Sequence, residues 1–104
     1  MAEVKFSSFA EADLENIFSY FAKYNINSAR KLLLELKQKF QLLANNPKLG
    51  RTHDDFILNL RSFPYKNFVI FYFQIENGVE IYRVLHGSRD IDSLFEDFFA
   101  GLKP

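Results

Sequence analysis

The chain has 104 residues, which is enough for one domain with a hydrophobic core and too few for two, so we expect a single domain over residues 1–104. Thirteen basic and thirteen acidic residues cancel, and this balance excludes broad nonspecific binding to nucleic acid. There is no cysteine, which excludes disulfides and thiolate metal sites and favours the cytoplasm.

The N-terminal part predicts a strand followed by a helix. Met1-Ala2-Glu3-Val4-Lys5 lacks the basic and apolar regions of a signal peptide, and no apolar run reaches the ~20 residues of a membrane-spanning helix, so we expect no membrane association. Residues 2–6 alternate as in a short strand. Ser8 and Glu11 have the spacing of a capping box, which predicts a helix from Ser8. Its apolar face consists of Leu14, Ile17, Phe18 and Phe21, with Asp13, Glu15 and Asn16 turned outward.

A second, longer helix follows the turn at residues 24–27, and it ends at Pro47 because proline cannot continue a helix. Two helices joined by a short turn predict an antiparallel hairpin. The lysine and arginine side chains of the second helix are interpreted as its solvent-exposed face. Its apolar stripe consists of Ala29, Leu32, Leu33, Leu36, Phe40 and Leu43.

After Gly50 the sequence changes to strand patterns. One strand ends at Phe63-Pro64, and residues 67–75 are almost wholly apolar, which is typical of a central strand buried on both faces. Asn77-Gly78 predicts a tight hairpin turn into residues 79–85. These last two long strands should therefore be antiparallel neighbours.

The C-terminal residues predict a final short helix. Asp90 or Asp92 can cap it, and its apolar face consists of Leu94, Phe95, Phe98 and Phe99. The predicted fold class is α+β, with a small antiparallel sheet, an N-terminal helical hairpin packed on it, and the order βααβββα.

Polar side chains crowd the end of the last long strand, in the segment Arg83-Val84-Leu85-His86-Gly87-Ser88-Arg89-Asp90. Adjacent strands could bring the guanidinium groups of Arg61, Arg83 and Arg89 onto one surface, where they could clamp a phosphate or a carboxylate. His86 could act in acid/base catalysis or bond a backbone carbonyl, and its position alone does not decide. A structural ion pair is an equally open interpretation of each arginine, with Glu80, Asp90 and Asp92 as candidate partners.

Other kinds of chemistry have weaker support. His53 is interpreted as part of a solvated loop, because its surroundings lack the spacing of metal ligands. Ser88 is interpreted as a turn residue, because no glycine-flanked nucleophile elbow is present. The glycines are scattered and form no phosphate-binding loop. We therefore expect neither a metal site nor a cofactor.

Six segments stand in a fixed order along the chain. They are Ala12-Asp13-Leu14-Glu15-Asn16-Ile17, Asn27-Ser28-Ala29, Leu43-Ala44-Asn45-Asn46-Pro47-Lys48-Leu49-Gly50-Arg51, Leu60-Arg61, Val69-Ile70-Phe71-Tyr72 and Ile81-Tyr82-Arg83-Val84-Leu85-His86-Gly87-Ser88-Arg89-Asp90. Together they resemble the ParE branch of the ParE/RelE superfamily of type II toxins, and the likeness covers about the whole chain.

The resemblance implies a bacterial toxin held inactive by a cognate antitoxin, whose C-terminal segment wraps across the toxin surface. Toxins of the RelE branch cut messenger RNA in the ribosome with an arginine in the third strand, an arginine after the fourth and often a tyrosine in the last helix. Here Arg89 matches the second position, whereas Phe68-Val69 and Phe95 occupy the other two. Apolar side chains cannot stabilise a phosphate transition state or move a proton. The resemblance therefore implies a non-enzymatic inhibitor of DNA gyrase, and so of DNA replication.

Two alternatives remain open. The protein could be a ribosome-dependent mRNA endoribonuclease of the RelE type that uses Arg61, His86 and Arg89, or an inactive relative that only binds its antitoxin. Under the gyrase interpretation we expect no catalytic residue and no direct sequence-specific binding to nucleic acid. The candidate target contacts are then Arg61, Arg83, His86 and Arg89.

The antitoxin is expected in a hydrophobic groove between the helical hairpin and the sheet edge. Its candidate contacts are Phe18, Phe21, Leu36 and Phe40, although helical spacing also predicts that these four residues are simply core. Assembly as a homodimer or as a toxin–antitoxin heterotetramer is left open by the sequence.

Overall fold

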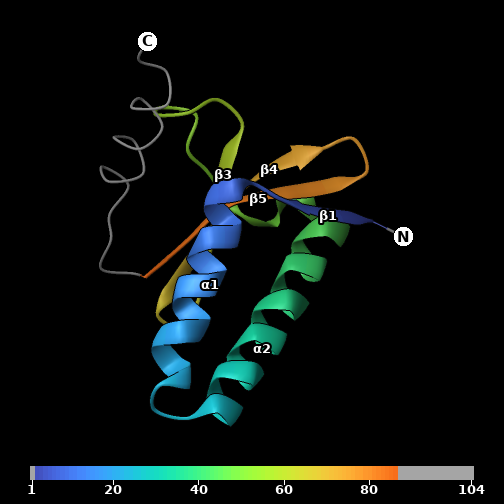
Figure 1. Cartoon of the computed structure of the whole chain (residues 1–104). Helices are drawn as coiled ribbons and strands as arrows, with labels where there is room; N and C mark the ends of the chain where they lie inside the picture. Colours follow the sequence, from blue (N-terminus) through green and yellow to red (C-terminus); the bar gives the residue numbers. More distant parts are fainter. Residues whose placement is uncertain (1, 87–104) are drawn as a thin grey trace.

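The structure is a computed structural model, and it describes residues 2–86. No helix within these residues is both long and apolar enough to cross a membrane. In chain order the elements are β1 (Glu3–Phe6), α1 (Ser8–Ala22), α2 (Ile26–Asn45), the 3-10 turn η1 (Pro47–Leu49), β2 (Arg51–Thr52), β3 (Leu60–Tyr65), β4 (Phe68–Ile75) and β5 (Gly78–His86) (Figure 1).

The strands form one mixed sheet in the order β1-β5-β4-β3-β2. The pairs from β2 to β5 are antiparallel, but β1 pairs parallel with β5, so the sheet is not wholly antiparallel as predicted. Parallel neighbours need a long crossover, which here contains both helices and three strands, and no local pattern signals such a pair. The α+β class and the order of the main elements are confirmed, while the predicted final helix lies outside the described residues.

The predicted hairpin between β4 and β5 is present. Its two-residue loop is Glu76-Asn77, and Gly78 already pairs with Ile75 as the first residue of β5. A Cβ at Gly78 would collide with the backbone of Glu3 in β1. Glycine at this position therefore lets β1 lie directly beside β5.

Helix α1 begins at Ser8 as predicted, but the residue that caps it is Ser7 and not Ser8. The N-cap is Ser7, whose Oγ accepts a hydrogen bond from the backbone N–H of Ala10 at 3.0 Å, while Ser8 is already helical. The same Oγ donates to the carbonyl of Tyr82 in β5 at 2.6 Å. This second bond favours Ser7 over Ser8 as the N-cap. Ser7 directly follows β1, so its side chain can cap the helix and at the same time bond to β5, the neighbour of β1.

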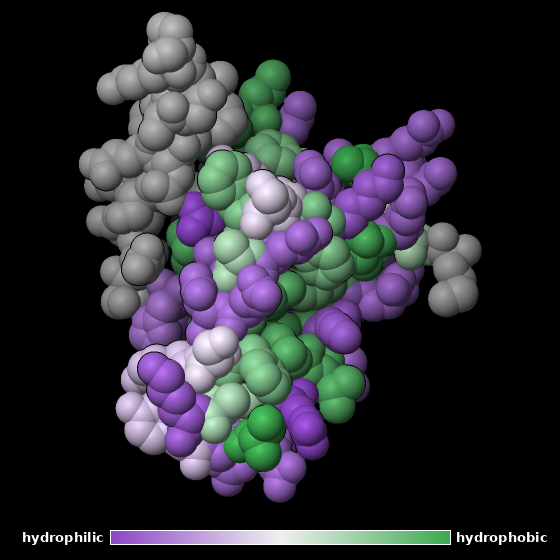
Figure 2. All heavy atoms as spheres, viewed as in Figure 1, coloured by the Kyte–Doolittle hydropathy of each residue, from purple (hydrophilic) through white to green (hydrophobic). Residues whose placement is uncertain are grey.

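The two helices lie side by side on one face of the sheet (Figure 1). Figure 2 shows this face, on which hydrophobic residues gather along the middle and hydrophilic residues flank them. Beneath the helices is the main core: Ala10, Leu36, Phe40, Leu43, Ala44, Phe68, Ile70, Tyr72, Val79, Ile81 and Val84. A second apolar cluster contains Ile57, Leu60, Phe71, Tyr82 and Leu85.

A β-bulge in β5 explains why this strand does not alternate. Phe71 pairs with Arg83 and Tyr72 pairs with Ile81, so Tyr82 is an extra residue in β5. A bulge shifts the following residues by one position and bends the strand. As a result Ile81 and Val84 both join the main core, although three positions separate them.

The turn after α2 is fixed by two groups from the sheet, the buried hydroxyl of Tyr72 and the guanidinium of half-buried Arg61. The hydroxyl of Tyr72 donates to the carbonyl of Pro47 at 2.7 Å and accepts the N–H of Gly50 at 2.8 Å. Arg61 Nη1 donates to the carbonyls of Gly50 at 2.7 Å and Lys48 at 3.2 Å. A Cβ at Gly50 would collide with the Tyr72 hydroxyl, so this position requires glycine.

We expect Tyr72→Phe to destabilise the protein by roughly 1–3 kcal/mol, because it leaves the buried N–H of Gly50 without a partner. The free energy of unfolding in urea measures this effect. The matched control is Tyr24→Phe, whose side chain is 76% exposed and whose change should stay within about 0.5 kcal/mol. Equal effects of the two substitutions would contradict the role of the Tyr72 hydroxyl.

Candidate functional site at the free edge of β5

Strand β5 extends beyond its neighbour β1. The register pairs Phe6, the last residue of β1, with Ile81, so within residues 2–86 no strand lies beside β5 on this side from Tyr82 to His86. Helix α1 runs past this free edge instead. A strand edge carries backbone N–H and C=O groups that can bond to another molecule. The side chains of α1 that lie along this edge therefore decide which of these groups remain accessible.

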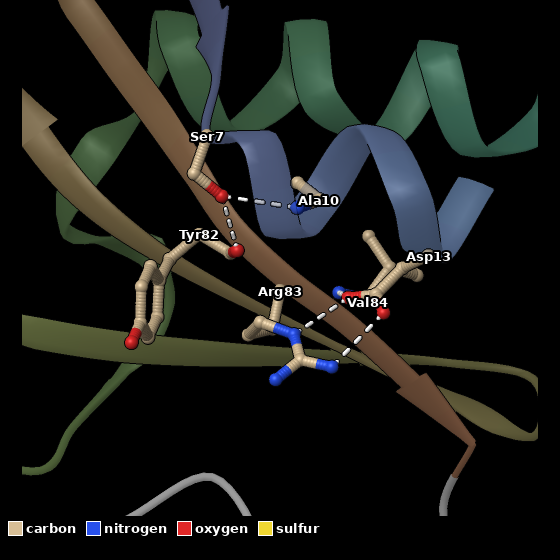
Figure 3. Close-up of polar contacts among 6 residues, drawn as sticks. All are labelled: Ser7, Ala10, Asp13, Tyr82, Arg83 and Val84. Carbon is tan, nitrogen blue, oxygen red and sulfur yellow. Dashed lines mark hydrogen bonds and ion pairs between the residues drawn. The ribbon is translucent and has the colours of Figure 1, made fainter. Parts of the chain in front are cut away.

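Asp13 of α1 occupies the middle of this edge (Figure 3). Its Oδ2 accepts hydrogen bonds from Arg83 Nε at 2.8 Å and from the backbone N–H of Val84 at 3.0 Å, and its Oδ1 accepts one from Arg83 Nη2 at 3.0 Å. The Asp13 and Arg83 side chains are only 12% and 10% exposed. Charges removed from water to this extent persist only when paired and hydrogen-bonded, and the two-point contact provides both.

A pocket of about 740 Å³ opens next to this ion pair, between α1 and the ends of β4 and β5. Aromatic rings form much of its wall: Phe21 contacts Phe68 edge-on, and Phe68 contacts His86 edge-on. The full lining is Asp13, Asn16, Ile17, Tyr20, Phe21, Asn67, Phe68, Arg83, Val84, Leu85 and His86. The pocket is thus an apolar and aromatic cavity whose lining also includes the amide side chains of Asn16 and Asn67 and the Asp13–Arg83 ion pair.

The four predicted target contacts do not lie together. Arg83 and His86 both line the pocket, whereas Arg61 lines a different one and binds the turn after α2. Arg89 lies outside the described residues. Arg83 does form a structural ion pair, and within the described residues this pair is with Asp13 and not Glu80, while the candidate partners Asp90 and Asp92 lie outside those residues.

Asp13 was predicted to point outward, and this was wrong. The residues one helical turn away on either side are Phe9 and Ile17, so Asp13 interrupts an apolar row at the border of the buried face. That interruption is the signal available in the sequence. It does not identify the partner, because Arg83 is 70 positions away along the chain.

The predicted antitoxin contacts fall into two groups. Leu36 and Phe40 are 0% and 1% exposed, so the core interpretation holds for them and they offer no surface to a partner. Phe18 and Phe21 are half-buried, and Phe21 lines the pocket.

His53 is not part of a solvated loop as predicted. Its ring is half-buried, its Nε2 lies 2.6 Å from Ser62 Oγ, and it packs near Phe71. Burial, together with the positive charge of Arg51, lowers the pKa of His53 below its ordinary value of 6.5. Within residues 2–86 no three histidine, aspartate or glutamate side chains gather as a metal site would require.

Comparison with known proteins decides the family. A family model described as the ParE toxin of type II toxin–antitoxin system, parDE, matches residues 4–91. The chain belongs to the ParE toxin family. The resemblance drawn from the sequence is thereby confirmed.

Individual relatives of this ParE family member agree with the assignment. Toxin ParE1 of Mycobacterium tuberculosis (strain CDC 1551 / Oshkosh) is 30% identical over 85 residues, which cover 80% of this chain and 87% of that toxin. Toxin ParE1 of Caulobacter vibrioides is 29% identical over 89 residues, which cover 85% and 92%. A solved structure of the chromosomal ParDE TA system from P. aeruginosa superposes with a TM-score of 0.67 at 19% identity, covering 83% of this chain and 96% of that one. This structural likeness concerns the fold.

We expect this ParE protein to lose stability as the pH falls below about 6.5, because the unfolded chain then binds a proton at His53 that the folded protein does not. Urea unfolding between roughly pH 5.5 and 7.5 measures the dependence. His53→Gln should remove this part of the slope. An identical slope in both proteins would show that His53 titrates alike in the folded and unfolded states.

Proposed function

We propose that this ParE toxin inhibits DNA gyrase and so blocks DNA replication, without being an enzyme. The observation that carries the proposal is the family match over residues 4–91. A gyrase inhibitor acts by binding, so it needs a recognition surface and no set of catalytic groups. Among the described residues, the pocket between α1 and the ends of β4 and β5 offers such a surface.

The contacts of Arg61 in β3 and Arg83 in β5 support a non-enzymatic function. Arg61 is committed to backbone carbonyls of the turn after α2, and Arg83 is committed to Asp13. Catalysis of RNA cleavage needs charged groups that converge on one phosphate. Arg61 and His86 line separate pockets, which argues against the ribonuclease alternative built on them. Of the other two candidate gyrase contacts, His86 lines the pocket beside α1 and Arg89 lies outside the described residues.

We propose further that a cognate antitoxin neutralises the toxin by inserting apolar side chains into the pocket beside α1. Ile17, Phe21 and Phe68 supply the apolar lining, and Tyr20, 57% exposed, stands at its rim. The Asp13–Arg83 pair leaves no net charge in the lining to oppose an apolar guest. Such a pocket fits the insertion of a partner's hydrophobic residues, the common mode of helix and tail recognition.

We expect the purified protein to inhibit DNA supercoiling by gyrase, and the cognate antitoxin to restore it. His86→Ala and Arg89→Ala should each raise the toxin concentration needed for half inhibition by roughly tenfold, the usual effect of removing a contact at the centre of an interface. Arg30→Ala is the matched control, since it removes an exposed positive charge from α2 and should change nothing.

No inhibition by a large molar excess of the wild-type protein would overturn the gyrase proposal. Cleavage of messenger RNA in translating ribosomes would support the RelE-type alternative instead. Inactivity in both assays, with antitoxin binding retained, would identify an inactive relative.

A further inference from the structure

A strand from another molecule could extend the sheet wherever a strand edge has free backbone groups. Two such stretches, on β5 beyond β1 and on β3 beyond β2, are blocked by side chains or by proline. At the free edge of β5, the carbonyl of Tyr82 accepts Ser7 Oγ and the N–H of Val84 donates to Asp13. An incoming strand would have to break a nearly buried ion pair to bond there. This edge is therefore closed to strand addition.

The edge of β3 beyond β2 is closed in another way. The carbonyl of Leu60 points toward the β2 side, where it accepts the N–H of His53 at 2.9 Å, and Ser62 pairs with Arg51. Alternate residues of a strand point their backbone groups the same way, so Pro64 faces outward past the end of β2. Proline has no N–H, and this stretch of edge lacks the donor that an added strand needs.

The outer edge of β1 is open at Val4 and Phe6, while just before the strand the carbonyl of Ala2 accepts a hydrogen bond from Gln41 Nε2 at 3.3 Å. Glu3 N–H bonds to Asn77 and Ser7 N–H bonds to Ile81, so the odd-numbered residues face β5 and the N–H and C=O groups of Val4 and Phe6 face outward. Within the described part of the chain, no hydrogen bond is recorded to these outward groups. A backbone group without a protein partner must be in contact with water or with another molecule.

The charged side chains of β1 make this edge complementary to the same edge of a second copy of the chain. Glu3 and Lys5 are exposed and flank Val4. We propose that a second copy of the chain joins here, with the two β1 strands antiparallel and Val4 opposite Val4. In this register each Val4 exchanges both backbone bonds with its counterpart, and each Glu3 lies opposite the Lys5 of the partner. The result is a two-fold symmetric dimer with one continuous sheet.

The charges also select this register over its neighbours. Only registers that place outward-facing residues opposite one another can form the backbone bonds. Moving the partner by one such step in either direction places Glu3 opposite Glu3 or Lys5 opposite Lys5, and like charges directly opposite are unfavourable. Because β1 has four residues, the interface is small and the dimer forms only at high protein concentration.

Sedimentation velocity over a concentration series tests the proposal with four full-length proteins: the wild type, Glu3→Lys, Lys5→Glu and the double variant with both changes. We expect the wild type to dimerise between roughly 10 µM and 1 mM, as a small interface allows. Each single change should raise the dimer dissociation constant by about tenfold, because it converts both cross-strand ion pairs into like-charge pairs. The double variant should return to the wild-type value.

Far-ultraviolet circular dichroism and the urea midpoint establish that each variant is folded, which is expected since both side chains are exposed. A wild-type protein that stays monomeric over the whole range overturns the proposal. So does a dimer that is indifferent to the single changes, or a double variant as weak as the singles, since either result places the contact elsewhere.

Discussion

The carboxylate of Asp13 holds together parts of the molecule that lie 70 positions apart in the chain. It fixes the Arg83 guanidinium through two hydrogen bonds and occupies the backbone N–H of Val84. Helix α1 is thereby set against β5 just where the bulge at Tyr82 changes the direction of the strand. The position of α1 in turn shapes the pocket between Ile17 and His86, so the proposed recognition surface depends on this one buried contact.

The contacts of Arg83 and Arg61 show that these two charged side chains have structural roles within the fold. The sequence offered Arg83 as a candidate target contact, but its Nε and Nη2 donate hydrogen bonds to Asp13, and its guanidinium lies over the ring of Phe9. Arg61 is similarly engaged by the turn after α2. Both arginines therefore have structural roles: Arg83 is paired with Asp13 beside the aromatic pocket, and Arg61 holds the turn after α2.

Local patterns in the sequence predicted the parts of the fold that local forces determine. Helical spacing gave both helices, and the glycine-containing turn gave the β4–β5 hairpin. The parallel β1–β5 pair, the bulge at Tyr82 and the partner of Arg83 were missed because each depends on contacts between distant segments. His53 was taken as solvated for the same reason, since Ser62 and Phe71 reach it only in the folded sheet. For the site, the sequence singled out His86 as a candidate target contact, and it lines the pocket, whereas the role of Asp13 was missed.

Hydrogen exchange of the Val84 amide tests the central role of Asp13 most directly. This N–H lies at an edge of β5 beside which no strand of residues 2–86 runs, and it donates to the Asp13 carboxylate. The account predicts slow exchange in the wild type and in Glu15→Ala, an exposed control on the same helix. In Asp13→Ala, exchange at Val84 should become at least tenfold faster than at Ile70 in the sheet interior, since it then needs only local opening. Unchanged protection of Val84 in Asp13→Ala would contradict the account.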